Sequence, residues 1–292
     1  HLLGAGNSIG KEMVLHPFSA AVGFTGSYSG GKALTEYASK REIPVPVFAE
    51  MSSINPVIFL PDTIAENGDL LAQQFVASLN LGAGQFCTNP GLVIVMECDG
   101  LNNFISKITT AISTAIPQKM LHNGIHQSYN AGLENMLKQK GIQLLAQSLQ
   151  PPLEMEGRPS FARVTASAFL GNPALHEEVF GPYSLMIVCN NKEEMIAVLH
   201  SLKGQLTGTI MGTIEDFETH SDIIEIQTSL AGRVILNGAP TGVEVCASMV
   251  HGGPFPATTD GRFTSVGTGA IKRWVRPVCF QNFSDSLLPD AL

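Results

Sequence analysis

Short apolar runs alternate with amphipathic segments along most of this chain, and this alternation restricts the possible folds more than any other feature. Each run is long enough for a buried strand. The segments between runs place apolar residues at helical spacing, as at Ala33, Leu34, Tyr37 and Ala38. Strands that alternate with helices build mostly parallel sheets with both faces covered. We therefore predict an α/β fold with a mostly parallel sheet.

The apolar runs and amphipathic segments predict individual elements. Strands are expected at residues 19–26, 44–51, 56–62, 91–97, 184–190, 208–213 and 232–238. Helices are expected at residues 31–43, 68–85, 104–113, 129–141 and 192–204. Residues 164–182 and 238–269 are rich in glycine and proline and are predicted to be long loops, which in such folds often carry function.

Composition excludes several classes of protein. The net charge of −8, without a basic stripe, argues against a nucleic-acid partner. No apolar run approaches the ~20 residues of a membrane span, and no signal peptide is apparent. The five cysteines are scattered without C-x-x-C spacing, which disfavours a zinc or disulfide framework and indicates a reducing cytoplasm. His122 and His126 have helical spacing but lack the glutamate of H-E-x-x-H, so a surface or capping role is expected and no metal site is predicted.

The segment GFTGSYSGGKAL, residues 23–34, places a glycine-rich turn between a predicted strand and a predicted helix. In this setting the backbone N–H groups at a helix start can bind a phosphate. The turn is similar to a nucleoside-triphosphate loop, but Ala33 stands where that loop needs a hydroxyl for magnesium, which disfavours this interpretation. A plain turn and a dinucleotide cradle, in which Gly26 and Gly31 allow close backbone approach, both remain open.

Two residues at the ends of predicted elements are candidates for catalysis. Glu50 ends an apolar strand, and ligand crevices in α/β folds form at strand ends. Cys87 lies in a glycine-rich loop between a long helix and a strand. The structural alternatives are a carboxylate on a solvated face and a small buried cysteine. The residues alone leave both interpretations open for each position.

Four motifs in this order carry a family resemblance: GFTGSYSGG, FAEMSSINPVIF, GQFCTNPG and HEEVFGP. Together they resemble the aldehyde dehydrogenase superfamily. The segments FARVTASAFLGNPALHEEVFGP and HGGPFPATTDGRFTSVGTGAIKRWVRPVCFQN are most similar to its α-ketoglutarate semialdehyde (2,5-dioxovalerate) dehydrogenase branch. The resemblance runs through the whole chain but covers the C-terminal portion of a usual family member. It implies the tail of a Rossmann-type nucleotide-binding domain followed by an α/β catalytic domain.

The resemblance implies NAD(P)-dependent oxidation of an aldehyde, such as a semialdehyde, to the acid. Cys87 would attack the carbonyl carbon as a thiolate and form a thiohemiacetal, then a thioester after hydride transfer. Glu50 would be the general base that activates water to release the acid. The backbone N–H of Cys87 would be one oxyanion donor, and the asparagine that supplies the other in the family lies upstream of this sequence.

The resemblance also implies positions that bind NAD or NADP and the aldehyde. Glu178 would hydrogen-bond the nicotinamide ribose, Phe180 would pack against the nicotinamide, and Gly26 and Ser27 would contact the pyrophosphate. The full set of expected cofactor positions is Gly26, Ser27, Gly31, Met51, Glu178 and Phe180. The expected substrate positions are Phe86, Thr88, Arg163, Phe255 and Arg262, and one of the two arginines would pair with the carboxylate of an acidic substrate.

By the same resemblance, residues 1–50 would be the C-terminal part of the nucleotide-binding domain, residues 51–265 the catalytic domain, and residues 266–292 a C-terminal return with an oligomerisation strand. Residues 274–283, WVRPVCFQNF, resemble a strand that joins a sheet between subunits, which implies a homodimer or homotetramer. The family's partner hairpin is not in this sequence, so this edge is expected to be unpaired. The sequence begins at His1 without a methionine, and we expect this polypeptide alone not to turn over.

Two other functions are weighed against aldehyde oxidation. An acyl-thioester reductase of similar fold can dispense with a hydrolytic base, so the presence of Glu50 argues against it. A non-catalytic structural or binding fragment is disfavoured because Cys87 and Glu50 are both present.

Overall fold

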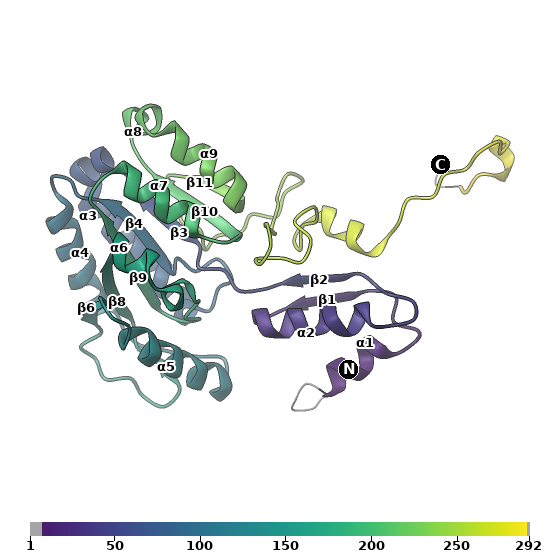
Figure 1. Cartoon of the computed structure of the whole chain (residues 1–292), viewed down its shortest axis with the longest axis horizontal. Coiled ribbons are helices and arrows are strands. Elements are labelled where there is room, and N and C mark those ends of the chain that lie inside the picture. The colour runs from purple at the N-terminus through teal and green to yellow at the C-terminus, as the bar shows by residue number, and fades with distance from the viewer. Residues whose placement is uncertain (1–7, 291–292) are drawn as a thin grey trace.

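Seven strands form the main sheet, in the order β11-β10-β3-β4-β9-β8-β6. Every neighbouring pair is parallel except β6 with β8. The predicted α/β fold with a mostly parallel sheet is therefore confirmed. In the computed structural model, which describes residues 8–290, the parallel strands β1 and β2 form a separate small sheet that lies beside the main body together with α1 and α2 (Figure 1).

The strands and helices have the following bounds. The strands are β1 (Val22–Thr25), β2 (Val47–Glu50), β3 (Pro56–Phe59), β4 (Leu92–Met96), β5 (Gln118–Lys119), β6 (Gln143–Gln147), β7 (Glu156–Gly157), β8 (Ser160–Thr165), β9 (Tyr183–Cys189), β10 (Gln205–Met211) and β11 (Ala231–Leu236). The α-helices are α1 (Ser8–Leu15), α2 (Tyr28–Ser39), α3 (Pro61–Asn80), α4 (Leu101–Thr114), α5 (Asn123–Leu137), α6 (Ala166–Leu170), α7 (Lys192–Ser201), α8 (Ile214–Thr219) and α9 (Ser221–Leu230). Short 3₁₀ helices are η1 (Leu81–Gly84), η2 (Pro173–His176), η3 (Thr268–Trp274) and η4 (Asp285–Leu287).

The main sheet is buried on both faces, so alternate residues of one strand enter two different cores. Ile58 and Ile94 belong to the core that contains buried side chains of α5, α6, α7 and α9. Val57 and Val93, one position earlier on the same strands, belong to the core formed with α3 and α4. This double burial explains why the strands appear in the sequence as continuous apolar runs. Among residues 8–290, no helix has both the length and the apolar character that crossing a membrane would take.

Each strand and helix predicted from the apolar runs and amphipathic segments is present, with ends that shift by up to seven residues. The predictions omitted α1, β5, β6, β7, β8, α6, α8 and α9, and the segment expected as a loop at 164–182 contains α6 and η2. These short helices were missed because tertiary packing stabilises them more than their own propensity does. His122 takes the expected capping role, because its ring accepts the N–H of Ile125 at the start of α5.

The first turn of α3 depends on a carboxylate from another helix. Leu60 precedes α3 and offers no side-chain acceptor, so the free N–H groups of this turn need another partner. Asp216 of α8 accepts the N–H groups of Asp62 and Thr63 at 3.1 and 2.9 Å. The same carboxylate closes the capping box of α8 with Thr213. Asp216 therefore joins the starts of two helices.

Replacing Asp216 with alanine is expected to lower the free energy of unfolding by about 3 kcal/mol, because three backbone N–H groups lose a charged acceptor. Asp216 is 2% exposed, so water cannot replace the carboxylate without rearrangement. Denaturant unfolding followed by circular dichroism measures the change. Glu218→Ala, an exposed position in the same helix, is the matched control and should stay within about 0.5 kcal/mol of the wild type. Equal effects of the two substitutions would contradict the capping role.

Residues 274–283, which resemble a strand of a sheet between subunits, form no strand with any segment of residues 8–290. Between η3 and η4 the chain has no regular element, and Figure 1 shows this part extending away from the body of the protein. A strand needs a partner for its N–H and C=O groups, and no segment within residues 8–290 pairs with this one. The side chains of Val275, Val278 and Phe283 are exposed as a result.

Candidate active site

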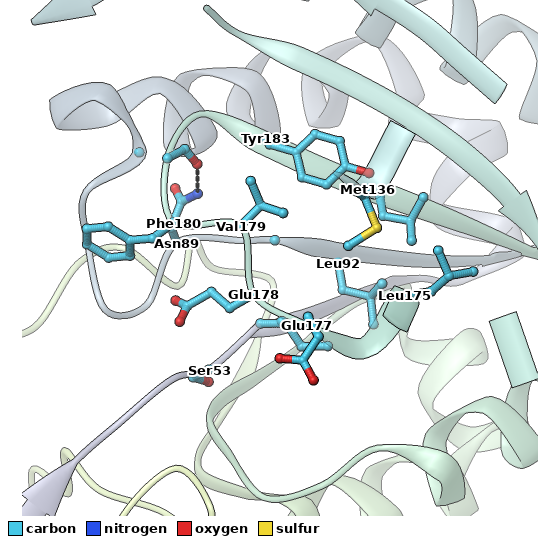
Figure 2. Close-up of a pocket in the computed structure, with 15 residues that line it drawn as sticks. Ser53, Asn89, Leu92, Met136, Leu175, Glu177, Glu178, Val179, Phe180 and Tyr183 are labelled. Atoms are coloured by element: carbon cyan, nitrogen blue, oxygen red, sulfur yellow. Dashed lines mark hydrogen bonds between the residues drawn. The ribbon is translucent and has the colours of Figure 1, made fainter. Parts of the chain in front are cut away.

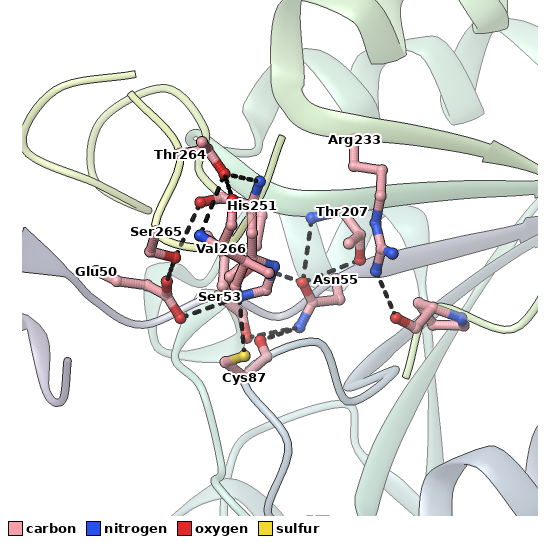
Figure 3. A network of polar contacts seen from close by, with 12 residues as sticks. Glu50, Ser53, Asn55, Cys87, Thr207, Arg233, His251, Thr264, Ser265 and Val266 are labelled. Carbon is pink, nitrogen blue, oxygen red and sulfur yellow. Dashed lines mark hydrogen bonds and ion pairs between the residues drawn. The ribbon is translucent and has the colours of Figure 1, made fainter. Parts of the chain in front are cut away.

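Cys87 and Glu50, the two candidates for catalysis, lie close together with His251 between them (Figure 3). The Sγ of Cys87 is 3.2 Å from Nε2 of His251, and the same nitrogen is 3.2 Å from Oε1 of Glu50. His251 and Glu50 are 5% and 6% exposed, whereas Cys87 is half-buried. All three reactive atoms lie within 4.8 Å of one another. Such spacing would also suit a metal ion, but the direct hydrogen bonds satisfy the three groups without one.

Glu50 is the last residue of β2, and the loop of residues 251–265 covers it. This loop docks along β2 by backbone hydrogen bonding, in which the Thr259 N–H donates to the carbonyl of Ala49 at 3.0 Å. The hydroxyl of Ser265 donates to Oε2 of Glu50 at 2.6 Å. The two carboxylate oxygens of Glu50 therefore have different partners, Ser265 on one and the imidazole ring on the other, and the side chain is fixed in one orientation.

Asn55 holds the Cys87 loop against the segment that follows Glu50. Its side-chain amide donates to the carbonyls of Cys87 and Asn89 at 2.9 and 3.0 Å. Asn55 is buried and has a left-handed backbone with φ 48°, a conformation that asparagine tolerates better than most residues. Because β3 begins directly after Asn55 and β4 follows the Cys87 loop, the site lies between the carboxyl end of β2 and the amino ends of β3 and β4.

His251 is the residue of this site that the sequence analysis missed. Its N–H donates to Oγ1 of Thr264, and its carbonyl accepts the N–H of Ser265 at 2.8 Å, so the backbone is fixed on both sides. Gly232 of β11 allows the loop to come close, because a Cβ there would collide with the carbonyl of Gly252. The available signal was a histidine followed by two glycines inside a long loop expected to be functional, but 164 residues separate it from Cys87.

The hydrogen bonds of this site stabilise the charged forms of Glu50 and His251. Burial alone would raise the pKa of the Glu50 carboxyl, but hydrogen bonds from His251 and Ser265 outweigh burial and hold that pKa below its usual value. The hydrogen bond with Cys87, followed by the one with Glu50, raises the pKa of His251 to about 9. At neutral pH the site therefore contains an imidazolium beside a carboxylate.

The glycine-rich turn leads from β1 into α2, as the sequence predicts. The Ser27 hydroxyl accepts the N–H of Gly30 at 3.2 Å and caps the helix. Gly31 lies against β2 so closely that a Cβ there would be 2.6 Å from Sδ of Met51. Met51 is itself 4% exposed, and its side chain packs against the turn at Gly31. Met51 was expected among the cofactor positions, and its side chain lies between the turn and β2.

A cavity of about 700 Å³ lies next to the start of α2. Its lining brings together Tyr28 of α2, Ser52 just after β2, and Glu178 from the HEEVFGP motif. Phe255, which was expected at the substrate, also lines this cavity and packs edge-on against Tyr28 with ring centroids 6.1 Å apart. The glycine-rich turn and Glu178, which are far apart in the sequence, thus border one space.

Glu178 extends toward the segment that carries Ser53, as Figure 2 shows. Burial raises the pKa of Glu178 to about 7, and the neighbouring Ser52 and Ser53 only partly offset the effect of burial. Phe180 and Glu178 both line a second pocket next to the cavity of about 700 Å³. The carboxyl group therefore titrates near neutral pH and faces a space large enough for part of a ligand.

The side chains of three expected substrate positions are buried or contact other protein groups. Thr88 is fully buried, so its side chain cannot reach a substrate, whereas its neighbour Phe86 is 36% exposed. Arg163 lies on β8, two strands away from β4, and donates to the side chain of Gln143 on the edge strand β6. Arg262 is exposed and pairs with Asp260 at 2.6 Å. Both guanidinium groups are therefore engaged by other protein groups in this structure.

A sequence profile described as "Aldehyde dehydrogenase family" matches residues 1–255. The chain is 46% identical over 288 residues to an α-ketoglutaric semialdehyde dehydrogenase of Acinetobacter baylyi, a match that covers 98% of this chain and 55% of that protein. It is 44% identical over 291 residues to α-ketoglutaric semialdehyde dehydrogenase 2 of Azospirillum brasilense, covering 100% of this chain and 55% of that protein. The chain thus spans 55% of the length of these two relatives.

Solved structures show the same fold. A γ-glutamyl-γ-aminobutyraldehyde dehydrogenase from Burkholderia cenocepacia superposes with a TM-score of 0.74 at 20% identity, covering 90% of this chain and 52% of that one. A betaine aldehyde dehydrogenase from Staphylococcus aureus superposes with a TM-score of 0.77 at 17% identity, covering 97% of this chain and 57% of that one.

Proposed function

Because the chain belongs to the aldehyde dehydrogenase family, we propose that it takes part in the NAD(P)-dependent oxidation of an aldehyde to a carboxylic acid. The observation that carries this proposal is the meeting of Cys87 and Glu50 in one site, with their reactive atoms within 4.8 Å. The proposed substrate is a semialdehyde such as α-ketoglutarate semialdehyde. The identities of 46% and 44% to proteins of that name support this substrate.

The residues present fit NAD or NADP at two points. The turn before α2 offers backbone N–H groups at a helix start, and Gly31 keeps the helix against β2 where a side chain would collide. Glu178 borders the cavity of about 700 Å³ that begins at this helix. When bound, the dinucleotide supplies the hydride acceptor. Gly26 and Ser27 are proposed at the pyrophosphate, Glu178 at the ribose and Phe180 beside the nicotinamide.

The chain's own residues account for carbon–sulfur bond formation and for hydrolysis. The thiolate of Cys87 bonds to the aldehyde carbon, and the carbonyl electron pair moves to oxygen, where the Cys87 N–H is the proposed donor. After oxidation the acyl group remains on sulfur as a thioester. Glu50 then takes a proton from water as the water oxygen bonds to the acyl carbon, and the carbon–sulfur bond breaks. The acid leaves and Cys87 is regenerated.

We further propose the domain division at residues 50 and 265, a homodimer or homotetramer, and a cytoplasmic location. The separation of the β1–β2 sheet from the main sheet supports the first boundary. The exposed apolar side chains between η3 and η4 support a contact with another subunit, since an unpaired segment of this kind can gain a partner by joining the edge of another sheet. The scattered free cysteines support a reducing compartment.

A turnover assay tests the proposed function. In a polypeptide of full family length that contains these residues, α-ketoglutarate semialdehyde with NAD⁺ or NADP⁺ is expected to give reduced dinucleotide and acid in equal amounts. Reduced dinucleotide without free acid, or reduction of an acyl-CoA in preference to aldehyde oxidation, would favour the acyl-thioester reductase. A full-length protein with neither activity would favour a non-catalytic role.

A further inference from the structure

Two loops that carry proposed site residues contact each other beyond the amino ends of β4 and β9. Cys87 lies five residues before β4, and Glu178 lies five residues before β9. The two strands pair in parallel, which fixes the strands themselves but not the residues that precede them. The position of Cys87 relative to Glu178 therefore depends on contacts between the two loops.

Two contacts between these loops converge on Gly181, the residue after Phe180. The side-chain amide of Asn89 donates to the Gly181 carbonyl at 3.1 Å (Figure 2). On the other side of Cys87, Gly84 packs so closely that a Cβ there would be 2.3 Å from the Gly181 carbonyl carbon. Cys87 thus lies between two residues that both pack against Gly181.

The amide of Asn89 is held in one orientation. Asn89 is 8% exposed, and no group within residues 8–290 hydrogen-bonds its Oδ1. Because the Gly181 carbonyl is an acceptor, the amide nitrogen rather than the amide oxygen faces it. The backbone of Asn89 is fixed as well, since its N–H donates to the Phe86 carbonyl at 3.0 Å and its carbonyl accepts the Asn55 amide.

Gly181 is in turn anchored to the body of the protein. Its carbonyl also accepts the N–H of Tyr183, the first residue of β9, at 2.8 Å. The ring of Tyr129 packs so closely that a Cβ at Gly181 would be 2.3 Å from it. Within the part of the chain that the structure describes, the contact with Asn89 is the one hydrogen bond between residues 84–91 and residues 177–182. The side chain of Asn89 therefore joins the Cys87 loop to an anchored point of the Glu178 loop.

We propose that Asn89 is a positioning residue for hydride transfer, which sets the distance between the Cys87 sulfur and the two residues proposed at the nicotinamide ribose and ring, Glu178 and Phe180. This role rests on the proposed function. In that step the carbon bonded to sulfur passes a hydrogen with its electron pair to the dinucleotide, and an electron pair on the oxygen re-forms the carbonyl of the thioester. A displacement of about 1 Å can slow such a step by about 100-fold.

Single-turnover kinetics test this role in a polypeptide of full family length that contains these residues. N89D replaces the N–H donor with an acceptor at nearly the same volume, and N89A removes the amide. In both variants the rapid first phase of reduced dinucleotide is expected to slow by about 10- to 100-fold, and KM for the dinucleotide should rise. Deuterium at the aldehyde carbon should slow this phase further, because transfer of that hydrogen then limits it. If N89D does not fold, N89A decides the outcome.

Alkylation of Cys87 by iodoacetamide, without aldehyde or dinucleotide, separates positioning from a general loss of structure. The backbone hydrogen bonds of the turn around Cys87 do not involve the side chain of Asn89. The alkylation rate of Cys87 in both variants should therefore stay within about threefold of the wild type. The matched control is N103A, which removes an exposed amide that donates to Asp69 at the surface and should leave both the first phase and alkylation unchanged.

Three results would overturn the positioning role. The first is a first phase in N89A as fast as in the wild type, and the second is a slowed first phase without a deuterium effect. The third is an equal loss of the first phase and of Cys87 alkylation, since the whole cysteine loop would then have moved. A wild-type protein that forms no reduced dinucleotide would instead refute the proposed function, and a role in hydride transfer with it.

Discussion

Replacing Cys87 with alanine is expected to lower kcat/KM for aldehyde oxidation by about 10⁴-fold or more, because no other thiol can reach the same position. Cys98 and Cys189 lie elsewhere in the fold, where burial raises the pKa of both thiols. The measurement is steady-state formation of reduced dinucleotide by a full-length polypeptide that contains these residues. Covalent capture of the aldehyde on Cys87, detected by mass spectrometry after quenching, should disappear at the same time.

Cys246→Ala is the matched control for Cys87, since Cys246 is an exposed thiol in a loop. It should keep activity within about twofold, in line with the small effects of surface substitutions. If Cys87→Ala kept more than about one hundredth of the wild-type rate, covalent catalysis by this sulfur would be wrong, since loss of a nucleophile costs far more.

Glu50→Gln is expected to slow turnover by about 10²- to 10⁴-fold, because an amide cannot take a proton from water. Carbon–sulfur bond formation needs no proton from Glu50, and the amide oxygen can still accept the His251 hydrogen bond. The variant should therefore release about one equivalent of reduced dinucleotide in a rapid first phase, and then stall with the acyl group on Cys87. Rapid-mixing absorbance detects the first phase of reduced dinucleotide, and intact-protein mass spectrometry detects the acyl group on Cys87.

The control for Glu50 is Glu244→Gln, an exposed glutamate in the loop after β11 that should leave both phases unchanged. A Glu50→Gln variant that lost the first phase together with steady turnover would place Glu50 in thiolate formation instead of hydrolysis. A variant with normal turnover would show that another group activates the water.

Much of the fold could be predicted because burial leaves a local pattern. Ile58 and Val57 enter opposite cores, so their strand had to be apolar throughout, and that run is visible in the sequence. The turn between β1 and α2 could also be predicted from its glycines, since the close approach of α2 to β2 requires glycine at position 31. The capping role of Asp216 could not be predicted, because nothing near Leu60 in the sequence shows that the cap of α3 comes from another helix.

The substrate positions show that closeness to Cys87 in the sequence does not predict which side chains can reach a substrate. Thr88 follows Cys87 directly, yet its side chain turns into the interior while Phe86 on the other side is partly exposed. A tight turn points successive side chains in different directions, and the sequence does not specify which one faces the ligand. Arg163 and Arg262 were chosen by charge, but other protein groups, Gln143 and Asp260, occupy both guanidinium groups.

The sequence by itself determined the parallel α/β sheet, the glycine-rich turn and the two candidate residues Glu50 and Cys87, because each depends on a local pattern of polarity, backbone freedom or residue type. Only the tertiary structure decided that His251 lies between them, 201 residues from Glu50. The loop that carries His251 docks on β2 through two backbone hydrogen bonds and through the hydroxyl of Thr259. These contacts join segments about 200 residues apart and follow no local periodicity, so the sequence does not reveal them.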